Sequence, residues 1–400
     1  MSASPSRLFI VCMLGALSVI SPFAIDMYLP LFPQMAQEFG VNGTAISLTI
    51  SSYFTGMALG QIFYGPLLDR YGRKKPLYFG LGLFILAALA CATTHHILPL
   101  IALRFLQAFG GCAAGVSSLA MIRDFFPIEE GAKILSRLFL FIAVSPLAAP
   151  SVGGIIMQFA GWRFVFVLMA TIVALILALM HWRLPESHQP DTSISLRPGP
   201  ILREYIAIIR HPKFATYAFA GAFSFAGLFT YVAGSPIIFM EDFHLSARHY
   251  AATFAGLAMG FIGGSQLNVR LLKRYSSETL FARILILQVI IGWAFVAASW
   301  FGIGLLPTLG FFFCFLACSG IAYPNAAAIA LSPFARNAGS AAAMLNFLQL
   351  GIGAGISTFI SVAPPHSALP IIAILGGTVT LAILVLAAGY RKAHRSMAMD

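Results

Sequence analysis

Charged residues are scarce in this chain, and acidic residues are scarcer still. Only 9% of the 400 residues are charged, and only 13 residues are Asp or Glu. A soluble domain of ordinary composition carries about 25% charged residues. Hydrophobic residues, in contrast, make up 59% of the chain. A composition this poor in charge excludes an ordinary soluble protein and indicates one embedded in a membrane.

Cysteine is also scarce, and its placement excludes two further classes. The five cysteines all lie within apolar runs, and none has the spacing of a disulfide framework or a zinc site. Cys314 and Cys318 are one helical turn apart, but no His or carboxylate joins them. The apolar runs also lack a His/Asp/Glu or Ser/His constellation. We therefore predict no metal site, no catalytic residues and no enzymatic activity.

The chain does contain apolar runs long enough to cross a bilayer, which takes about 20 helical residues. The first run is too long for a signal peptide and has no evident cleavage site, so we interpret it as a retained helix. The pattern predicts an all-α integral membrane protein with twelve transmembrane helices, near residues 8–34, 45–68, 76–94, 98–122, 136–158, 162–182, 214–238, 249–269, 280–301, 306–331, 338–362 and 369–390.

The basic residues concentrate on one side of these spans. With a cytoplasmic N-terminus, all 24 Lys and Arg except Arg104, Arg163 and Arg248 fall in cytoplasmic segments. This asymmetry is the positive-inside pattern that orients membrane proteins, and it places both termini in the cytoplasm. It also accounts for the net charge of +11. No nucleic-acid partner is therefore expected.

The longest polar interruption divides the spans into two sets of six. We predict an N-terminal six-helix bundle over residues 1–183, a cytoplasmic linker over 184–213 and a C-terminal six-helix bundle over 214–400. Within the linker, residues 201–210 have an amphipathic pattern that fits either a helix on the membrane surface or a disordered segment.

A short similarity between the two halves indicates a repeat. Leu67-Leu68-Asp69-Arg70-Tyr71 follows the second span, and Leu271-Leu272-Lys273-Arg274-Tyr275 follows the eighth. Parallel repeats of six helices build one large class of transporter. The similarity therefore favours a 6+6 arrangement with pseudo-symmetry.

One acid, Asp26, lies inside a long apolar stretch, where a charge is expensive and indicates function. Arg104 is the one cation that falls well within a span rather than near its edge. Helical rise places Asp26 about 12 Å and Arg104 about 9 Å from the external ends of their spans. We predict that they face each other or a shared cavity, and that Asp26 takes up and releases a proton. A fixed salt bridge between the two spans is the alternative.

The loop after the second span carries the most specific local pattern, Gly65-Pro66-Leu67-Leu68-Asp69-Arg70-Tyr71-Gly72-Arg73-Lys74-Lys75. Gly72 permits a tight turn, and Asp69 can pair with a cation or a helix N-terminus. The candidate partners are Arg123 and the start of the eleventh span at Asn337. We predict a cytoplasmic gate formed by Gly65, Asp69, Arg70, Gly72, Arg73 and Arg123. The loop resembles the G-x-x-x-D-R-x-G-R-(K/R) signature of the major facilitator superfamily.

Two further segments are similar to motifs of that superfamily. Residues 104–110 resemble the R-x-x-Q-G-x-G motif, with Ala108 in place of the first glycine. Residues 145–154 resemble the antiporter motif g-x-x-x-G-P-x-x-G-G, with Ser145 and Ala149 in place of two glycines. The matching residues, which favour exchange over symport, are Pro150, Gly153 and Gly154.

Residues 23–33 resemble the first-helix motif of the Bcr/CflA branch, which comprises bacterial inner-membrane drug:proton antiporters. Leu184-Pro185-Glu186-Ser187 and Gly234-Ser235-Pro236 are also similar to that branch. The resemblance implies alternating access and export of a drug or antibiotic, driven by the proton gradient without a cofactor. It places Asp26 and Arg104 at the family's embedded acid and arginine. We expect a monomer that binds a small amphiphilic or polar organic substrate.

A pocket for such molecules is mostly apolar with a few polar anchors. The substrate-binding candidates are Tyr28, Tyr53, Gln107, Phe225, Tyr231, Asn346 and Gln349. One alternative function is a proton-coupled carrier of a natural metabolite such as a nucleoside or an amino acid. A more distant alternative, a non-transporting membrane receptor, leaves the buried Asp26 and Arg104 unexplained.

Overall fold

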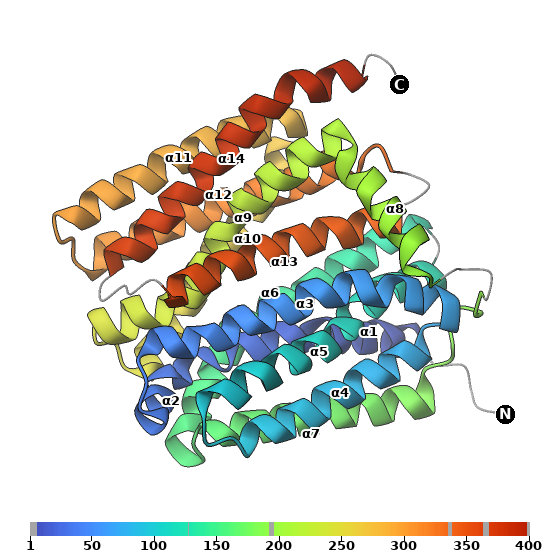
Figure 1. The fold of residues 1–400 in the computed structure, drawn as a ribbon, viewed down its shortest axis with the longest axis horizontal. Coiled ribbons are helices and arrows are strands. Elements are labelled where there is room, and N and C mark those ends of the chain that lie inside the picture. The colour runs from blue at the N-terminus through green and yellow to red at the C-terminus, as the bar shows by residue number, and fades with distance from the viewer. Residues whose placement is uncertain (1–5, 127, 192–195, 335–337, 363–367, 398–400) are drawn as a thin grey trace. The chain divides into compact units, whose positions relative to one another are not determined.

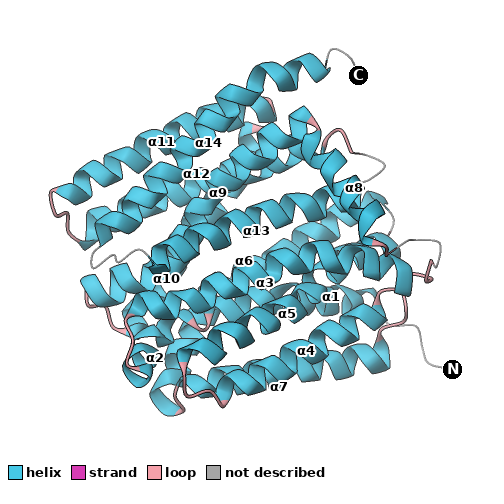
Figure 2. Ribbon diagram, viewed as in Figure 1, coloured by secondary structure: helices cyan, strands magenta, loops and turns pink. Residues whose placement is uncertain are grey.

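The computed structural model describes residues 6–126, 128–191, 196–334, 338–362 and 368–397. In these residues every regular element is a helix, as Figure 2 shows. The chain divides into two compact units, one with residues Met1–Gly40 and Ser52–Pro198 and the other with Val41–Ser51 and Gly199–Asp400. One boundary, Pro198, lies inside the segment 184–213 that was predicted as a linker.

The helices of the first half are, in chain order, α1 (Arg7–Asp26), the 3₁₀ turn η1 (Leu29–Leu31), α2 (Phe32–Phe39), α3 (Gly43–Tyr71), α4 (Lys74–Ala92), α5 (Ile97–Phe125), α6 (Ile128–Phe159) and α7 (Trp162–Arg183) (Figure 1). Those of the second half are α8 (Pro198–Arg210), α9 (Pro212–Pro236), the π-helical turn η2 (Ile237–Asp242), α10 (Ala247–Leu271), α11 (Ser277–Trp300), α12 (Leu305–Leu331), α13 (Ala338–Val362) and α14 (Ala368–Met397).

The first predicted apolar run covers α1, η1 and the start of α2, and each of the other eleven falls on a long helix, so the all-α prediction is confirmed. Within the described residues, nine helical stretches are long and apolar enough to cross a membrane. The described apolar part of α6, Val144–Phe159, is shorter. The helices α3 and α10 are less apolar because they carry hydroxyl and amide side chains, among them the buried Ser47, Thr49 and Asn268.

The same helix pairs recur in the two units. In the first unit α1 packs against α5, α6 and α7, and in the second α9 packs against α12, α13 and α14. Likewise α4 packs against α5 and α7, while α11 packs against α12 and α14. In chain order, α1, α4, α5, α6 and α7 of the first unit therefore correspond to α9, α11, α12, α13 and α14 of the second. This pattern confirms the predicted pair of pseudo-symmetric six-helix bundles.

The amphipathic segment in the linker is a helix. Residues 201–210 lie within α8, which buries Tyr205 and Ile208 on one face and exposes Leu202 and Ile206. The structure therefore favours the helix over the disordered alternative.

The apolar run 8–34 had suggested one continuous helix for the first span, but the structure shows a break. The helix α1 ends at Asp26, and a turn leads into η1 and α2. Pro30 and Pro33 stand at the starts of η1 and α2, and proline has no N–H to continue the helical hydrogen bonds. At the far end of α2, Glu38 accepts a hydrogen bond from Trp162 Nε1 at 2.6 Å. Because α1 is interrupted after Asp26, this residue lies at a helix end, next to an irregular stretch of backbone.

Candidate functional site

Asp26 is the last residue of α1, and its side chain is buried between α1 and α6. Only 7% of the residue is exposed. Ser145 of α6 is completely buried, and its Oγ donates a hydrogen bond to Asp26 Oδ2 at 3.0 Å. Serine at this position was expected only as a small residue in place of a glycine. Its hydroxyl is instead the direct partner of the embedded acid.

Arg104 of α5 is fully buried and held by both polar and aromatic groups. Its Nη1 donates to Gln107 Oε1 at 2.7 Å, and its Nη2 donates to the carbonyl oxygen of Ala24 at 3.2 Å. The guanidinium carbon also lies 4.6 Å from the ring centre of Tyr28 and 4.3 Å from that of Tyr53. Aromatic faces attract a cation most strongly where water is excluded. The contacts together hold a positive charge inside the first unit.

The structure places Asp26 and Arg104 in one neighbourhood but does not join them directly. Within the described residues no ion pair links the two side chains. Arg104 reaches α1 through the main chain of Ala24, two residues before Asp26. The expected direct pair is therefore replaced by two separate contacts, Asp26 with Ser145 and Arg104 with Ala24. The proton-coupling role of Asp26 and Arg104 stays a prediction.

The antiporter-like segment of α6 lies against the turn that follows Asp26. A Cβ atom added to Gly153 would overlap the carbonyl oxygen of Met27, so only glycine allows this approach. Gly154 is also buried, and the helix continues through Pro146 and Pro150. The sequence segment that resembles the antiporter motif thus contacts α1 at Asp26 and the following turn at Met27.

The predicted gate loop connects α3 to α4 by a tight turn. Gly72 has a φ angle of 81°, a left-handed conformation that favours glycine. The turn places Arg73 immediately before the first residue of α4. The prediction of a glycine-dependent turn is confirmed.

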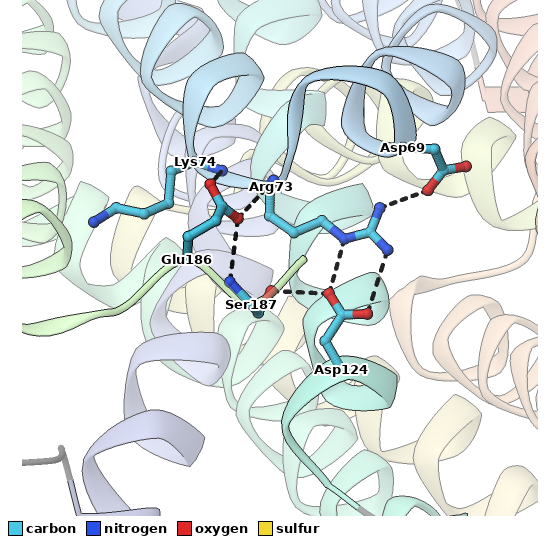
Figure 3. Close-up of polar contacts among 6 residues, drawn as sticks. All are labelled: Asp69, Arg73, Lys74, Asp124, Glu186 and Ser187. Carbon is cyan, nitrogen blue, oxygen red and sulfur yellow. Dashed lines mark hydrogen bonds and ion pairs between the residues drawn. The ribbon is translucent and has the colours of Figure 1, made fainter. Parts of the chain in front are cut away.

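Arg73 bridges two carboxylates from different helices, as Figure 3 shows. Its Nε and Nη2 donate to Asp124 of α5 at 2.8 and 3.3 Å, and its Nη1 donates to Asp69 of α3 at 2.6 Å. Burial lowers the pKa of the Arg73 guanidinium, but the hydrogen bonds and charges of Asp124 and Asp69 outweigh that effect and raise the pKa above its ordinary value. Arg73 therefore carries a permanent charge that ties α3, α4 and α5 together.

The linker after α7 also binds this loop. Glu186 accepts hydrogen bonds from the backbone N–H groups of Arg73 at 2.8 Å and Lys74 at 3.1 Å, at the start of α4. Ser187 Oγ donates to Asp124 Oδ2 at 2.8 Å, and Figure 3 shows both contacts. Lys74 Nζ donates to the carbonyl oxygen of Leu184 at 2.8 Å. The linker residues 184–187 therefore complete the cluster around Arg73.

The structure gives Asp69 a different partner from the predicted one. Asp69 pairs with Arg73 and not with Arg123, whose side chain is exposed. The physical reason is the i,i+4 spacing of Asp69 and Arg73 across the Gly72 turn, which brings the two charges together locally. Arg70 lies over the ring of Tyr71 at 5.8 Å, and a Cβ on Gly65 would meet nothing within 4 Å. Asn337 lies outside the described residues.

The candidate substrate residues fall into two groups. Tyr28, Tyr53 and Gln107 all contact Arg104 in the first unit. The others belong to the second unit, where the ring of Phe225 stacks on that of Tyr323 with centres 4.6 Å apart. Tyr231 is buried and stacks on Phe254, and α13 carries Asn346 and the buried Gln349. Binding by these residues stays a prediction.

Within the part of the chain that the structure describes, no group of three or more His, Cys, Asp or Glu side chains could hold a metal ion. The polar groups described above in the first unit include carboxylates, guanidinium groups and hydroxyls. Such groups can exchange protons and rearrange ion pairs.

Comparison with known proteins identifies the family. The model of the Major Facilitator Superfamily matches residues 14–358. A bicyclomycin resistance protein homolog of Haemophilus influenzae is 30% identical and covers 96% of each chain. Multidrug resistance protein D of Escherichia coli is 27% identical over 90% of this chain and 89% of its own length. These similarities confirm the resemblance to the Bcr/CflA branch.

A solved structure agrees with the fold. The crystal structure of a D-xylose-proton symporter superposes with a TM-score of 0.75 over 95% of this chain and 97% of that protein, at 16% sequence identity. At that identity the likeness concerns the fold alone. The fold, the matched sequence and the relatives agree: the chain is a multi-pass membrane protein that belongs to the Major Facilitator Superfamily.

Proposed function

We propose that this chain exports small amphiphilic or polar organic molecules, antibiotics among them, in exchange for protons across the inner membrane of a bacterium. The substrate class is supported by relatives named for bicyclomycin resistance and multidrug resistance. The direction of exchange is supported by the antiporter-like segment of α6. The protein works as a monomer, and the proton gradient drives it without a cofactor.

One observation carries the proton coupling: a carboxyl group is buried without a cation beside it. Asp26 bonds to the Ser145 hydroxyl, and no ion pair to it is found among the described residues. An unpaired carboxylate is expensive in such a place, so a change in its surroundings can bind or release a proton. A carboxyl locked to an arginine would stay ionised and carry nothing.

Arg104 supplies the fixed charge of the cycle. Its positive charge attracts a deprotonated Asp26 or the polar groups of a substrate. The rings of its neighbours Tyr28 and Tyr53 offer apolar surface for an organic molecule. In the proposed cycle Asp26 takes a proton from outside and releases it to the cytoplasm. Substrate moves outward in the alternate step, as one conformation replaces the other.

The cluster around Arg73 serves as the cytoplasmic gate in this proposal. The positive-inside pattern assigns the α3–α4 turn and both termini to the cytoplasm. Ion pairs and hydrogen bonds at Arg73, Asp124 and Glu186 can hold one conformation and be released in the other. Such contacts are discrete, and so they suit a two-state gate.

The test reconstitutes purified protein in liposomes that contain a pH-sensitive dye and an acidic interior. Bicyclomycin, chloramphenicol and a sulfonamide are added outside, and nucleosides and amino acids form a second set. A transported drug should raise the internal pH, because each molecule that enters is exchanged for a proton that leaves. A fall in internal pH would contradict exchange. A response to nucleosides or amino acids alone would favour a metabolite carrier, and no response to either set would favour a receptor.

A further inference from the structure

We propose that Ser145 is a positioning residue for proton exchange: its hydroxyl holds the Asp26 carboxyl on α6 and keeps it from pairing with Arg104. This inference rests on the proposed function, in which Asp26 carries the proton. It assigns a specific task to a residue that occupies a glycine position of the antiporter-like segment.

The hydroxyl of Ser145 bonds to a side chain from another helix, as the hydroxyl of Ser224 does with Gln288. Serines inside membrane helices commonly donate to the carbonyl four residues earlier, as Ser18 does to Leu14 and Ser319 to Phe315. Ser145 instead donates to a side chain 119 residues away in the sequence, at 3.0 Å. Because Ser145 is fully buried, water cannot replace that partner.

A serine hydroxyl suits an acid that gains and loses a proton. It donates to the carboxylate when Asp26 is ionised, and it accepts from the carboxyl O–H when Asp26 is protonated. A guanidinium can only donate, and its charge holds a neighbouring carboxylate in the ionised form. Contact with Ser145 therefore leaves both protonation states of Asp26 satisfied, whereas contact with Arg104 would favour one.

Competing donors are present on α5. Arg104 Nε and Gln107 Nε2 are buried, and neither has a hydrogen-bond partner within the described residues. Arg104 already reaches α1 at Ala24. A carboxylate released by Ser145 would gain a charge-assisted hydrogen bond by turning toward these donors. Ser145 thus decides which helix holds the acid.

Few charged or titratable groups among the described residues lie near Asp26 to influence its protonation. Of the helices that pack against α1, α5 contributes the charged Arg104, α6 contributes Ser145, and α7 contributes Phe166 beside the guanidinium. The titratable side chains in this neighbourhood are Asp26 itself, Tyr28, Tyr53, Cys91 and Cys112. Both tyrosine rings lie against Arg104. Among these groups Arg104 carries the fixed charge, and it reaches α1 through the carbonyl oxygen of Ala24.

Infrared titration tests the inference without a substrate. The C=O stretching band of a protonated, buried carboxyl is followed against pH in the full-length protein, and Asp26→Asn assigns the band by removing it. We expect Ser145→Ala to move the midpoint to lower pH by roughly one unit or more, because Arg104 then holds Asp26 ionised. Ser145→Thr, which keeps the hydroxyl, should restore the midpoint. Ser151→Ala, on an exposed position of α6, is the matched control and should change nothing.

The outcomes separate this inference from the proposed function. An unchanged or higher midpoint in Ser145→Ala would overturn the role of Ser145, even if Asp26 is the proton site. If Asp26→Asn removes none of the titrating carboxyl bands, Asp26 is not the proton site, and the proposed proton coupling is overturned. Should Ser145→Ala fail to fold, Ser145→Gly carries the same expectation, since it restores the glycine of the antiporter motif.

Discussion

The guanidinium of Arg104 lies over the ring of Tyr53, with its central carbon 4.3 Å from the ring centre. Both side chains are fully buried, so water does not compete with this contact. A desolvated cation–π contact is worth about 2 kcal/mol. The ring therefore helps to keep a positive charge in place where the bilayer offers no solvation.

We expect Tyr53→Ala to slow drug-driven proton exchange about tenfold, because the loss of the ring leaves Arg104 less well held. Tyr53→Phe keeps the aromatic face and should stay close to the parent rate. The measurement is the rate of internal pH change in liposomes after drug addition. Equal loss in both variants would show that the hydroxyl, and not the ring, matters.

Arg73 and Arg123 offer a matched pair of arginines near one end of α5. Arg73→Ala would leave the largely buried Asp124 carboxylate without its cation, so we expect destabilisation of about 3 kcal/mol and slower exchange. Arg123 is exposed, and Arg123→Ala should change stability by less than about 0.5 kcal/mol. Thermal unfolding in detergent measures the change in stability, and the liposome assay measures the change in exchange rate. Similar losses in both variants would refute the assignment of the gate to Arg73.

Glu186 is expected to act as a cap for α4. Its two carboxylate oxygens accept from the N–H groups of Arg73 and Lys74, where the helix dipole favours a negative charge. A glutamine has one acceptor oxygen, so Glu186→Gln should lower stability by about 1 kcal/mol. Glu204→Gln on α8 is the control. A melting temperature for Glu186→Gln equal to that of Glu204→Gln would contradict the capping role.

Gly153→Ala should damage both stability and exchange. The added methyl group would overlap the Met27 carbonyl oxygen, and backbone atoms cannot move away cheaply. Overpacking of this kind costs about 1–3 kcal/mol. Gly115→Ala on α5 is the control, because its Cβ would meet nothing within 4 Å, and alanine there should leave the melting temperature unchanged or raise it. A tolerated Gly153→Ala would show that α6 and the turn after Asp26 are not tightly packed.

The helices and the two isolated charges could be predicted from the sequence because both depend on local composition. Apolar runs have the length of a bilayer crossing, and a carboxylate or guanidinium within such a run is visible in the sequence. The break after Asp26 was not evident from hydrophobicity because residues 27–33 stay largely apolar, even though Pro30 and Pro33 mark it. Hydrophobicity alone does not report that a proline interrupts helical hydrogen bonds.

The partners of the key residues could not be predicted, because they depend on how distant helices pack. Ser145 is 119 residues from Asp26, and Glu186 is 113 residues from Arg73. Each looks ordinary in its own segment, one as a small residue in a helix and the other as an acid in a linker. The i,i+4 spacing of Asp69 and Arg73 is typical of an ion pair on a helix, but Gly72 between them indicated a turn and not a continuous helix, so the pair was not predicted.

The central claim is that Asp26 carries the exchanged proton, and transport by Asp26→Asn under a pH gradient tests it most directly. Liposomes with an acidic interior contain either the parent protein or Asp26→Asn, and the compound of the panel that the parent transports best is added outside. The account predicts that the parent accumulates this compound and raises the internal pH. It also predicts that Asp26→Asn, although folded and inserted, does neither above the level of protein-free liposomes. Undiminished gradient-driven accumulation by Asp26→Asn would contradict the assignment of Asp26 as the proton site.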